Sequence, residues 1–160
     1  MTEISVRHTF QGSLDEVFEA VINADRYPYV SRLVHIHRLC LAKSGEKDGV
    51  GTQREVELGV VWFKEEFTLF DRPNRVDYKI FETRPHFDHQ HGSFIFKKVG
   101  HKLIEVTWES CFIIPSQTIP PKIVSKVSGW MVKAAFKSAL MVLDKKLQEK
   151  RQPKRLANKA

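Results

Sequence analysis

The sequence predicts an α+β fold in which a strongly curved, antiparallel sheet of seven strands wraps around one long C-terminal helix. Six strand-like segments follow one another between residues 33 and 114, after a first one near the N-terminus. Turn residues separate most of them at short intervals, which favours antiparallel neighbours because parallel strands need long crossovers. The segment 120–150 then has the pattern of a helix that is apolar around most of its circumference.

The N-terminal elements follow from local patterns. Residues 2–10 alternate apolar and polar side chains, which is the period of a strand. Ser13 and Glu16 then have the spacing of a capping box, and apolar residues recur behind them at helical intervals. Residues 26–30 predict a turn or a second, very short helix, because Pro28 is tolerated only in the first turn of a helix. One or two short helices should therefore follow the first strand and close one end of the sheet.

The rest of the sheet comes from consecutive strand-like segments separated by turn residues. The predicted strands are 33–42, 51–58, 60–70, 75–84, 88–98 and 102–114. A sheet of this size must bury one face, and only the terminal helix has enough apolar surface to fill it. Sheet twist makes a curved sheet around that helix the economical arrangement.

The residue pattern of the terminal helix also predicts which of its sides the sheet covers. When residues 122–148 are wound at about 100° per residue, four lysines and Asp144 share an arc of roughly 60°. The rest of the circumference is apolar, broken by serines and, near the end, by other polar residues. We therefore expect the sheet to enclose the helix and the lysine arc to form the narrow strip that faces water.

Length and composition bound the classes of function. With 160 residues, 42% of them hydrophobic and 28% charged, the chain predicts one globular domain over 1–150. Only Cys40 and Cys111 are present, so neither a disulfide framework nor a cysteine-rich metal motif is predicted. The N-terminus lacks the basic start and apolar stretch of a signal peptide, and no apolar run is long enough to span a membrane. These features favour a reduced, cytoplasmic protein.

The net charge of +7 belongs mainly to the end of the chain. Lysines and arginines crowd the segment from Lys145 onward, where Glu149 is the one acid, and residues 1–144 are nearly neutral. A DNA-binding face is therefore not predicted. The basic tail, 151–160, is expected to be flexible. Weak contact of 145–160 with an anionic membrane surface or with RNA is an open alternative, and it would place the protein at the periphery of a membrane.

Three short anchors and the order of the elements resemble the START/Bet v 1-like (SRPBCC) helix-grip superfamily. The anchors are the helix 13–21 with Val17-Phe18, the dipeptide Tyr27-Pro28, and Gly49-Val50-Gly51-Thr52 leading into a strand. Within the superfamily, the pattern is most similar to the polyketide cyclase/dehydrase and lipid-transport group and distantly similar to coenzyme Q-binding proteins. The resemblance implies that an apolar ligand is held between the sheet and the terminal helix.

One broad side of the terminal helix carries small residues, such as Ser128 and Ala134, which affect whether that implied cavity exists. They either leave room for a ligand or allow the helix to pack closely on the sheet, and the residues alone leave both alternatives open. The resemblance favours the cavity, and alternation along the strands selects the residues that would face it. The expected lining is Arg54, Val56, Tyr78, Gln90, Phe94, Trp108, Ser110, Met131, Ala135 and Ser138.

Some of these side chains are polar and would orient the polar end of a ligand. Buried polar groups need hydrogen-bond partners, which a ligand can supply. Arg54 has a second interpretation, an internal ion pair with Glu82 or another acid. The charged pair Glu65 and Glu66 is interpreted as part of the solvated face of the sheet.

Two His-x-His pairs raise the question of a metal site. In a strand, His89 and His91 would point to the same side, as would His35 and His37. Each pair supplies two ligands, whereas a zinc site needs three or four. No metal and no cofactor are therefore predicted. Alternation places the pair at 89 and 91 on the side opposite Phe94, so these histidines are expected to face solvent.

Three functions remain open. The first is binding of a hydrophobic or amphipathic small molecule, such as a lipid, an isoprenoid quinone or a polyketide-like compound. The second is a cyclase or aromatase that uses the same cavity; no residue is assigned a catalytic role, so the sequence does not decide whether the protein is an enzyme. The third is an interaction module that docks on a membrane or a ribonucleoprotein through its basic tail.

Overall fold

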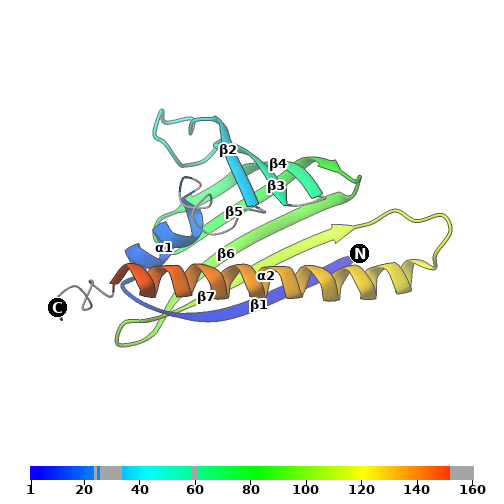
Figure 1. The fold of residues 1–160 in the computed structure, drawn as a ribbon. Helices are drawn as coiled ribbons and strands as arrows, with labels where there is room; N and C mark the ends of the chain where they lie inside the picture. The colour runs from blue at the N-terminus through cyan, green and yellow to red at the C-terminus, as the bar shows by residue number, and fades with distance from the viewer. Residues whose placement is uncertain (24, 26–33, 59–60, 152–160) are drawn as a thin grey trace, which may run out of the picture.

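The computed structural model describes residues 1–23, 25, 34–58 and 61–151 (Figure 1). The strands and helices in this part of the chain are β1 (Thr2–Gln11), α1 (Leu14–Ile22), β2 (Val34–Cys40), β3 (Gln53–Leu58), β4 (Val61–Asp71), β5 (Arg75–Arg84), β6 (Asp88–Gly100), β7 (Leu103–Ile113) and α2 (Pro121–Arg151). The predicted α+β fold, with a seven-stranded sheet and a long C-terminal helix, is confirmed. The second short helix expected at 26–30 and the tail beyond Arg151 lie outside the described residues.

All seven strands form one antiparallel sheet in the order β1-β7-β6-β5-β4-β3-β2. The strands from β2 to β7 are neighbours in sequence order, as their short links predict, and β1 pairs with β7. The edges of the sheet are therefore β1 and β2. Figure 1 shows α2 running beside β1, which it contacts along its length, with α1 near the C-terminal end of α2.

The short helix α1 begins where its capping box predicts. The backbone N–H of Glu16 donates to Ser13 Oγ at 3.3 Å, and the backbone N–H of Ser13 donates to Glu16 Oε2 at 2.9 Å. These bonds satisfy N–H groups that the start of a helix leaves without a partner. The apolar face of α1 then buries Val17, Phe18 and Val21 in the core.

The main core lies between the sheet, α1 and the C-terminal half of α2. Phe10 of β1 and Phe67 of β4 are fully buried there, as is Leu140 of α2. Leu143 and Leu147 continue the buried side of the helix by one and two further turns. This packing fixes the C-terminal half of α2 to the body of the protein.

The N-terminal half of α2 makes far fewer buried contacts with the rest of the protein. Gly129 is buried, and a Cβ added there would come within 3.0 Å of the Thr2 side chain on β1, but Trp130 and Met131 are 72% and 58% exposed. The expectation that the sheet encloses the helix is therefore wrong for this half. The reason is that α2 packs on β1, an edge strand, so no further strand covers its outer side. Neither α1 nor α2 combines the length and the apolarity needed to cross a membrane.

Candidate ligand-binding cavity

A cavity of about 360 Å³ lies between the sheet and the N-terminal half of α2. Its volume falls within the usual range of small-molecule sites. The walls come from β3 to β7, from the connection between β5 and β6, and from α2, and they are mostly apolar. The aromatic residues among them are Phe63, Tyr78, Phe87, Trp108, Phe112 and Phe136.

Trp108 and Phe136 join the two sides of the cavity. Their ring centroids are 3.6 Å apart and their planes are 8° from parallel, so Trp108 of β7 stacks on Phe136 of α2. Phe94 of β6 extends this group, with its ring centroid 4.7 Å from that of Trp108. The separation and tilt of the Phe94–Trp108 pair are typical of aromatic pairs that add to the stability that burial alone provides. The stack therefore attaches the middle of α2 to the sheet and gives the cavity an apolar wall.

Tyr78 lies across the sheet because its neighbour on the next strand is a glycine. Tyr78 of β5 pairs with Gly92 of β6, which in turn pairs with Ser110 of β7. A Cβ at Gly92 would lie 2.1 Å from Tyr78 Cζ, so the tyrosine ring occupies the space that a side chain would fill. The Tyr78 hydroxyl accepts a hydrogen bond from Trp108 Nε1–H at 2.8 Å. Burial raises the pKa of Tyr78 far above its ordinary value, so the phenol stays neutral.

His89 lies beside Ser110 at the same end of the cavity. The backbone N–H of Ile80 donates to His89 Nδ1 at 3.1 Å, and His89 Nε2 lies 3.1 Å from Ser110 Oγ. Because Nδ1 accepts a hydrogen bond, the proton of the neutral imidazole is on Nε2, which donates to Ser110. Burial lowers the pKa of His89 to about 4, with smaller contributions from His91 and Lys79. His89 is therefore neutral at physiological pH.

The structure corrects two expectations about β6. His89 is buried rather than facing solvent, and Gln90 is exposed rather than facing the cavity. The cause is a register shift between His89 and His91, which interrupts the alternation that runs back from Phe94. An extra residue at such a bulge turns the following side chains to the opposite face.

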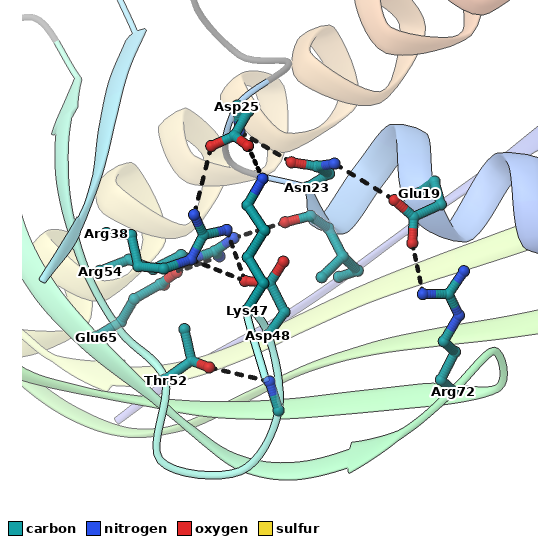
Figure 2. Close-up of polar contacts among 12 residues, drawn as sticks. Glu19, Asn23, Asp25, Arg38, Lys47, Asp48, Thr52, Arg54, Glu65 and Arg72 are labelled. Carbon is teal, nitrogen blue, oxygen red and sulfur yellow. Dashed lines mark hydrogen bonds and ion pairs between the residues drawn. The ribbon is translucent and has the colours of Figure 1, made fainter. Parts of the chain in front are cut away.

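A buried ion pair next to the cavity joins three elements (Figure 2). Arg54 Nε of β3 donates to Glu65 Oε1 of β4 at 2.8 Å, and Arg54 Nη1 donates to the carbonyl oxygen of Ile22, the last residue of α1, at 2.8 Å. The guanidinium also lies over the ring of Phe67, 4.4 Å from its centre. The Arg54 and Glu65 side chains are each 5% exposed, so each charge depends on the other.

This pairing decides between the two interpretations of Arg54. Its partner is Glu65 rather than Glu82, which pairs with Lys64. Arg54 and Val56 are buried but lie outside the cavity lining. Glu65 does line the cavity, so its interpretation as part of the solvated face is wrong. The alternation along β4 is unbroken here, because Phe63 and Glu65 both line the cavity and Phe67, two residues on, is fully buried. The extra residue at the nearby register shift is Phe81, on β5.

Part of the predicted lining comes together on the cavity: Tyr78, Trp108, Ser110, Met131 and Ala135. Phe94 is buried beside Trp108, and Ser138 is exposed farther along α2, outside the lining. Sequence reasoning missed His89, which lies at a register shift, and Glu65, which alternation places on the face of Phe63 and Phe67 but whose charge favoured a solvent-facing position. It also missed Phe136, although the spacing of four residues from Val132 places both on one side of the helix.

No protein-family model matches the sequence, and no curated protein sequence matches it. Solved structures match the fold. A protein from Thermus thermophilus does so with a TM-score of 0.73 at 16% identity, over 92% of this chain and 98% of its own. The Zhui aromatase/cyclase from a Streptomyces species has a TM-score of 0.73 at 14% identity, over 99% and 98% of the two chains. A START superfamily protein from Mycobacterium smegmatis has a TM-score of 0.68 at 14% identity, over 93% and 99%. Together with the curved sheet and its long C-terminal helix, these matches show that the chain has the START-like helix-grip fold.

Proposed function

We propose that the protein binds a hydrophobic or amphipathic small molecule, such as a lipid, an isoprenoid quinone or a polyketide-like compound, in the cavity between the sheet and α2. One observation carries the proposal: an apolar, largely aromatic cavity of about 360 Å³ has a small group of polar side chains on its sheet side. In small-molecule sites, apolar walls supply affinity and a few polar groups fix orientation. The fold matches to a START superfamily protein and to an aromatase/cyclase also support it.

The lining suggests how such a ligand would lie. Its apolar part would pack against the stacked rings of Trp108 and Phe136 and against Met131, where each Å² removed from water contributes about 25 cal/mol. Its polar end would meet Tyr78 and Ser110 on the sheet. Both ends of the molecule would then have complementary surroundings, which fixes one orientation.

Two adjacent alanines of α2 provide a matched test. Ala135 lines the cavity, whereas Ala134 lies on the outer side of the helix and outside the cavity lining. We expect extraction mass spectrometry to find an apolar molecule with the wild-type protein, either carried through purification or taken up from a mixed lipid extract. Ala135→Trp should remove that molecule because the indole fills the cavity, and Ala134→Trp should retain it. Equal retention in the two variants, or no uptake by the wild type, would count against the proposal.

The same contacts weigh against the alternative of a cyclase or aromatase. A general base needs a free lone pair within reach of the substrate. The Nδ1 lone pair of His89 already accepts from the Ile80 N–H, and Glu65 is paired with Arg54. We therefore expect a poly-β-ketone probe to bind without turnover. Cyclised product that disappears in His89→Gln, with binding retained, would favour the enzyme instead.

A further inference from the structure

The polar side of the cavity contains two hydroxyl groups whose hydrogen-bonding roles are set by their neighbours. We infer that the cavity selects ligands carrying an uncharged hydrogen-bond acceptor, such as a ketone, quinone or ester carbonyl, and that the hydroxyl pair Tyr78 and Ser110 supplies the donor. This inference rests on the proposed function, because it names the chemical class that the same cavity would take. It follows from the direction of each hydrogen bond around the two hydroxyls.

The Tyr78 hydroxyl must accept one bond and is free to donate another. Its partner at 2.8 Å is the indole Nε1–H of Trp108, and an indole nitrogen can only donate. The tyrosine oxygen is therefore the acceptor in this pair. The bond from Trp108 does not use the phenolic proton, and the neutral state of the buried phenol keeps that proton in place.

The Ser110 hydroxyl also accepts a hydrogen bond, in this case from His89. The Ile80 N–H occupies Nδ1 of the imidazole, which leaves the ring proton on Nε2, 3.1 Å from Ser110 Oγ. Ser110 therefore accepts from the histidine, and this bond does not use its own proton. A buried backbone N–H thus sets, through one imidazole, the role of a hydroxyl in the cavity lining.

At least one of these two protons is left for a ligand. Tyr78 and Ser110 also interact with each other, and a bond between two hydroxyls uses only one of their two protons. Within residues 1–23, 25, 34–58 and 61–151, neither hydroxyl donates to a carboxylate or to a carbonyl oxygen. A buried donor gains free energy when a ligand supplies the acceptor.

The charge of the lining excludes an anionic acceptor. In the described part of the chain, the lining residues of acidic or basic type are Glu65 and His89, and the imidazole is neutral. The nearby guanidinium of Arg54 is already engaged by Glu65 and by the Ile22 carbonyl. A ligand carboxylate would lose its hydration without gaining a counterion and would lie near the charge of Glu65. A neutral carbonyl meets the donors at no such cost.

Three probes of one shape test this inference: fluorene, 9-fluorenone and fluorene-9-carboxylate, measured by equilibrium dialysis. The affinity ratio of the ketone to the hydrocarbon should fall about 5-fold in the double variant Tyr78→Phe/Ser110→Ala, since one net hydrogen bond is lost. The single variants Tyr78→Phe and Ser110→Ala carry the same test if the double variant does not fold. Ser93→Ala is the matched control, because Ser93 is buried on β6 but donates to Glu109 outside the cavity lining. The carboxylate should bind more weakly than the hydrocarbon to the wild type.

The possible outcomes distinguish a failure of this inference from a failure of the proposed function. If fluorene binds but the ketone-to-hydrocarbon ratio is the same in the wild type and the variants, the donor pair is refuted and the apolar cavity stands. Tighter binding of the carboxylate than of the hydrocarbon also refutes it. If none of the three probes binds the wild type, the proposed function fails and the inference fails with it.

Discussion

His89 gives the protein a pH-dependent stability whose sign can be worked out. Burial lowers the pKa of this imidazole from 6.5 to about 4. Between these values the unfolded chain binds a proton at His89 that the folded chain does not. The free energy of unfolding should therefore fall as the pH drops from about 6.5 to about 4, by up to about 3 kcal/mol from this residue. Above this window, His89 contributes no pH dependence.

Urea unfolding of the wild type and of His89→Gln, from about pH 8 to about pH 4, measures this effect. The other titrating groups are common to both proteins, so the difference in the free energy of unfolding isolates His89. Any advantage of the wild type should be largest above about pH 6.5 and shrink toward about pH 4. Parallel curves would show that His89 titrates normally in the folded protein.

Gly92 sets the position of Tyr78. A Cβ at this residue would lie 2.1 Å from Cζ and 2.5 Å from the hydroxyl oxygen of the tyrosine, so Gly92→Ala forces the ring off the strand. We expect the variant to lose the bond from Trp108 and about 1–3 kcal/mol of the free energy of unfolding. The same substitution in a Tyr78→Ala background should cost far less, because nothing is left to clash. Denaturant unfolding of the four proteins gives the coupling, and equal costs in both backgrounds would contradict it.

Single side chains were predictable where strand alternation is unbroken. Along β7 the inward positions recur from Ile104 through Trp108 and Ser110, as the sequence predicts. His89 lies at a register shift, where the alternation along β6 changes face. Glu65 follows the unbroken alternation of Phe63 and Phe67, but its charge favoured a solvent-facing interpretation. A bulge depends on the pairing of two strands and has no signature in one of them. The inward position of His89 therefore could not be predicted from the sequence alone.

Between elements, the Arg54–Glu65 pair should behave as one unit. It connects β3 to β4 and, through the Ile22 carbonyl, to the end of α1. Arg54→Met leaves the Glu65 charge buried and unpaired, so we expect a loss of about 3–5 kcal/mol in the free energy of unfolding. The double variant Arg54→Met/Glu65→Met should be markedly more stable than the single one, because no charge is left without a partner.

An exposed pair beside it provides the control. Lys64 bonds to Glu82 across β4 and β5, and these side chains are 28% and 44% exposed. Lys64→Met should change the free energy of unfolding by about 0.5 kcal/mol or less, since surface ion pairs contribute little. Thermal and urea unfolding of the three variants would decide the matter. Similar losses for Arg54→Met and Lys64→Met would show that burial does not strengthen the inner pair.

The two halves of α2 should differ in what they contribute to stability. Leu143 is 3% exposed and packs in the core, so Leu143→Ala should lower the free energy of unfolding by about 2–4 kcal/mol. Trp130 is a larger side chain but is 72% exposed, and Trp130→Ala should stay within about 0.5 kcal/mol of the wild type. Denaturant unfolding compares the two directly. A large loss in Trp130→Ala would mean that this side chain is covered in solution.

The burial of α2 was the least predictable property of an element. Its length is confirmed, because the helix predicted over 120–150 is found at Pro121–Arg151. How much of its circumference is covered depends on which strands lie beside it. The helix lies on β1, an edge strand, and this is a property of the sheet as a whole. The expectation that the sheet encloses the helix therefore fits the C-terminal half of α2 but not the N-terminal half.

For the molecule as a whole, the basic end of the chain can be separated from the folded body at Arg151. This residue contacts the body, because Nη1 donates to the Gln11 carbonyl at 2.6 Å and the side chain pairs with Glu16. Deleting 152–160 should leave the thermal midpoint almost unchanged. It removes Lys154, Arg155 and Lys159, so sedimentation with anionic vesicles at low salt should show weaker binding. Unchanged vesicle binding would argue against a role for the tail at membranes.

The order of elements was the most predictable property of the whole chain. Short links between β2 and β7 leave few alternatives to an antiparallel meander, and the capping box fixes the start of α1. Ligand chemistry was much less predictable. The ligand class that we propose depends on the hydrogen-bond roles of Tyr78 and Ser110, and those roles arise from contacts with Trp108 and His89 on the folded sheet.

The difference in packing between the two halves of α2 also has a consequence for the rate at which a ligand would exchange. Segments with few buried contacts open at a small fraction of the free energy that global unfolding requires. The helical wall of the cavity from Ser128 to Ala135 belongs to the weakly held half, while Phe136, Leu140, Leu143 and Leu147 anchor the rest. A molecule bound as we propose would therefore be released by local opening of that wall. Its dissociation rate would then not depend on the rate of global unfolding. Residence time and stability could then change independently in evolution.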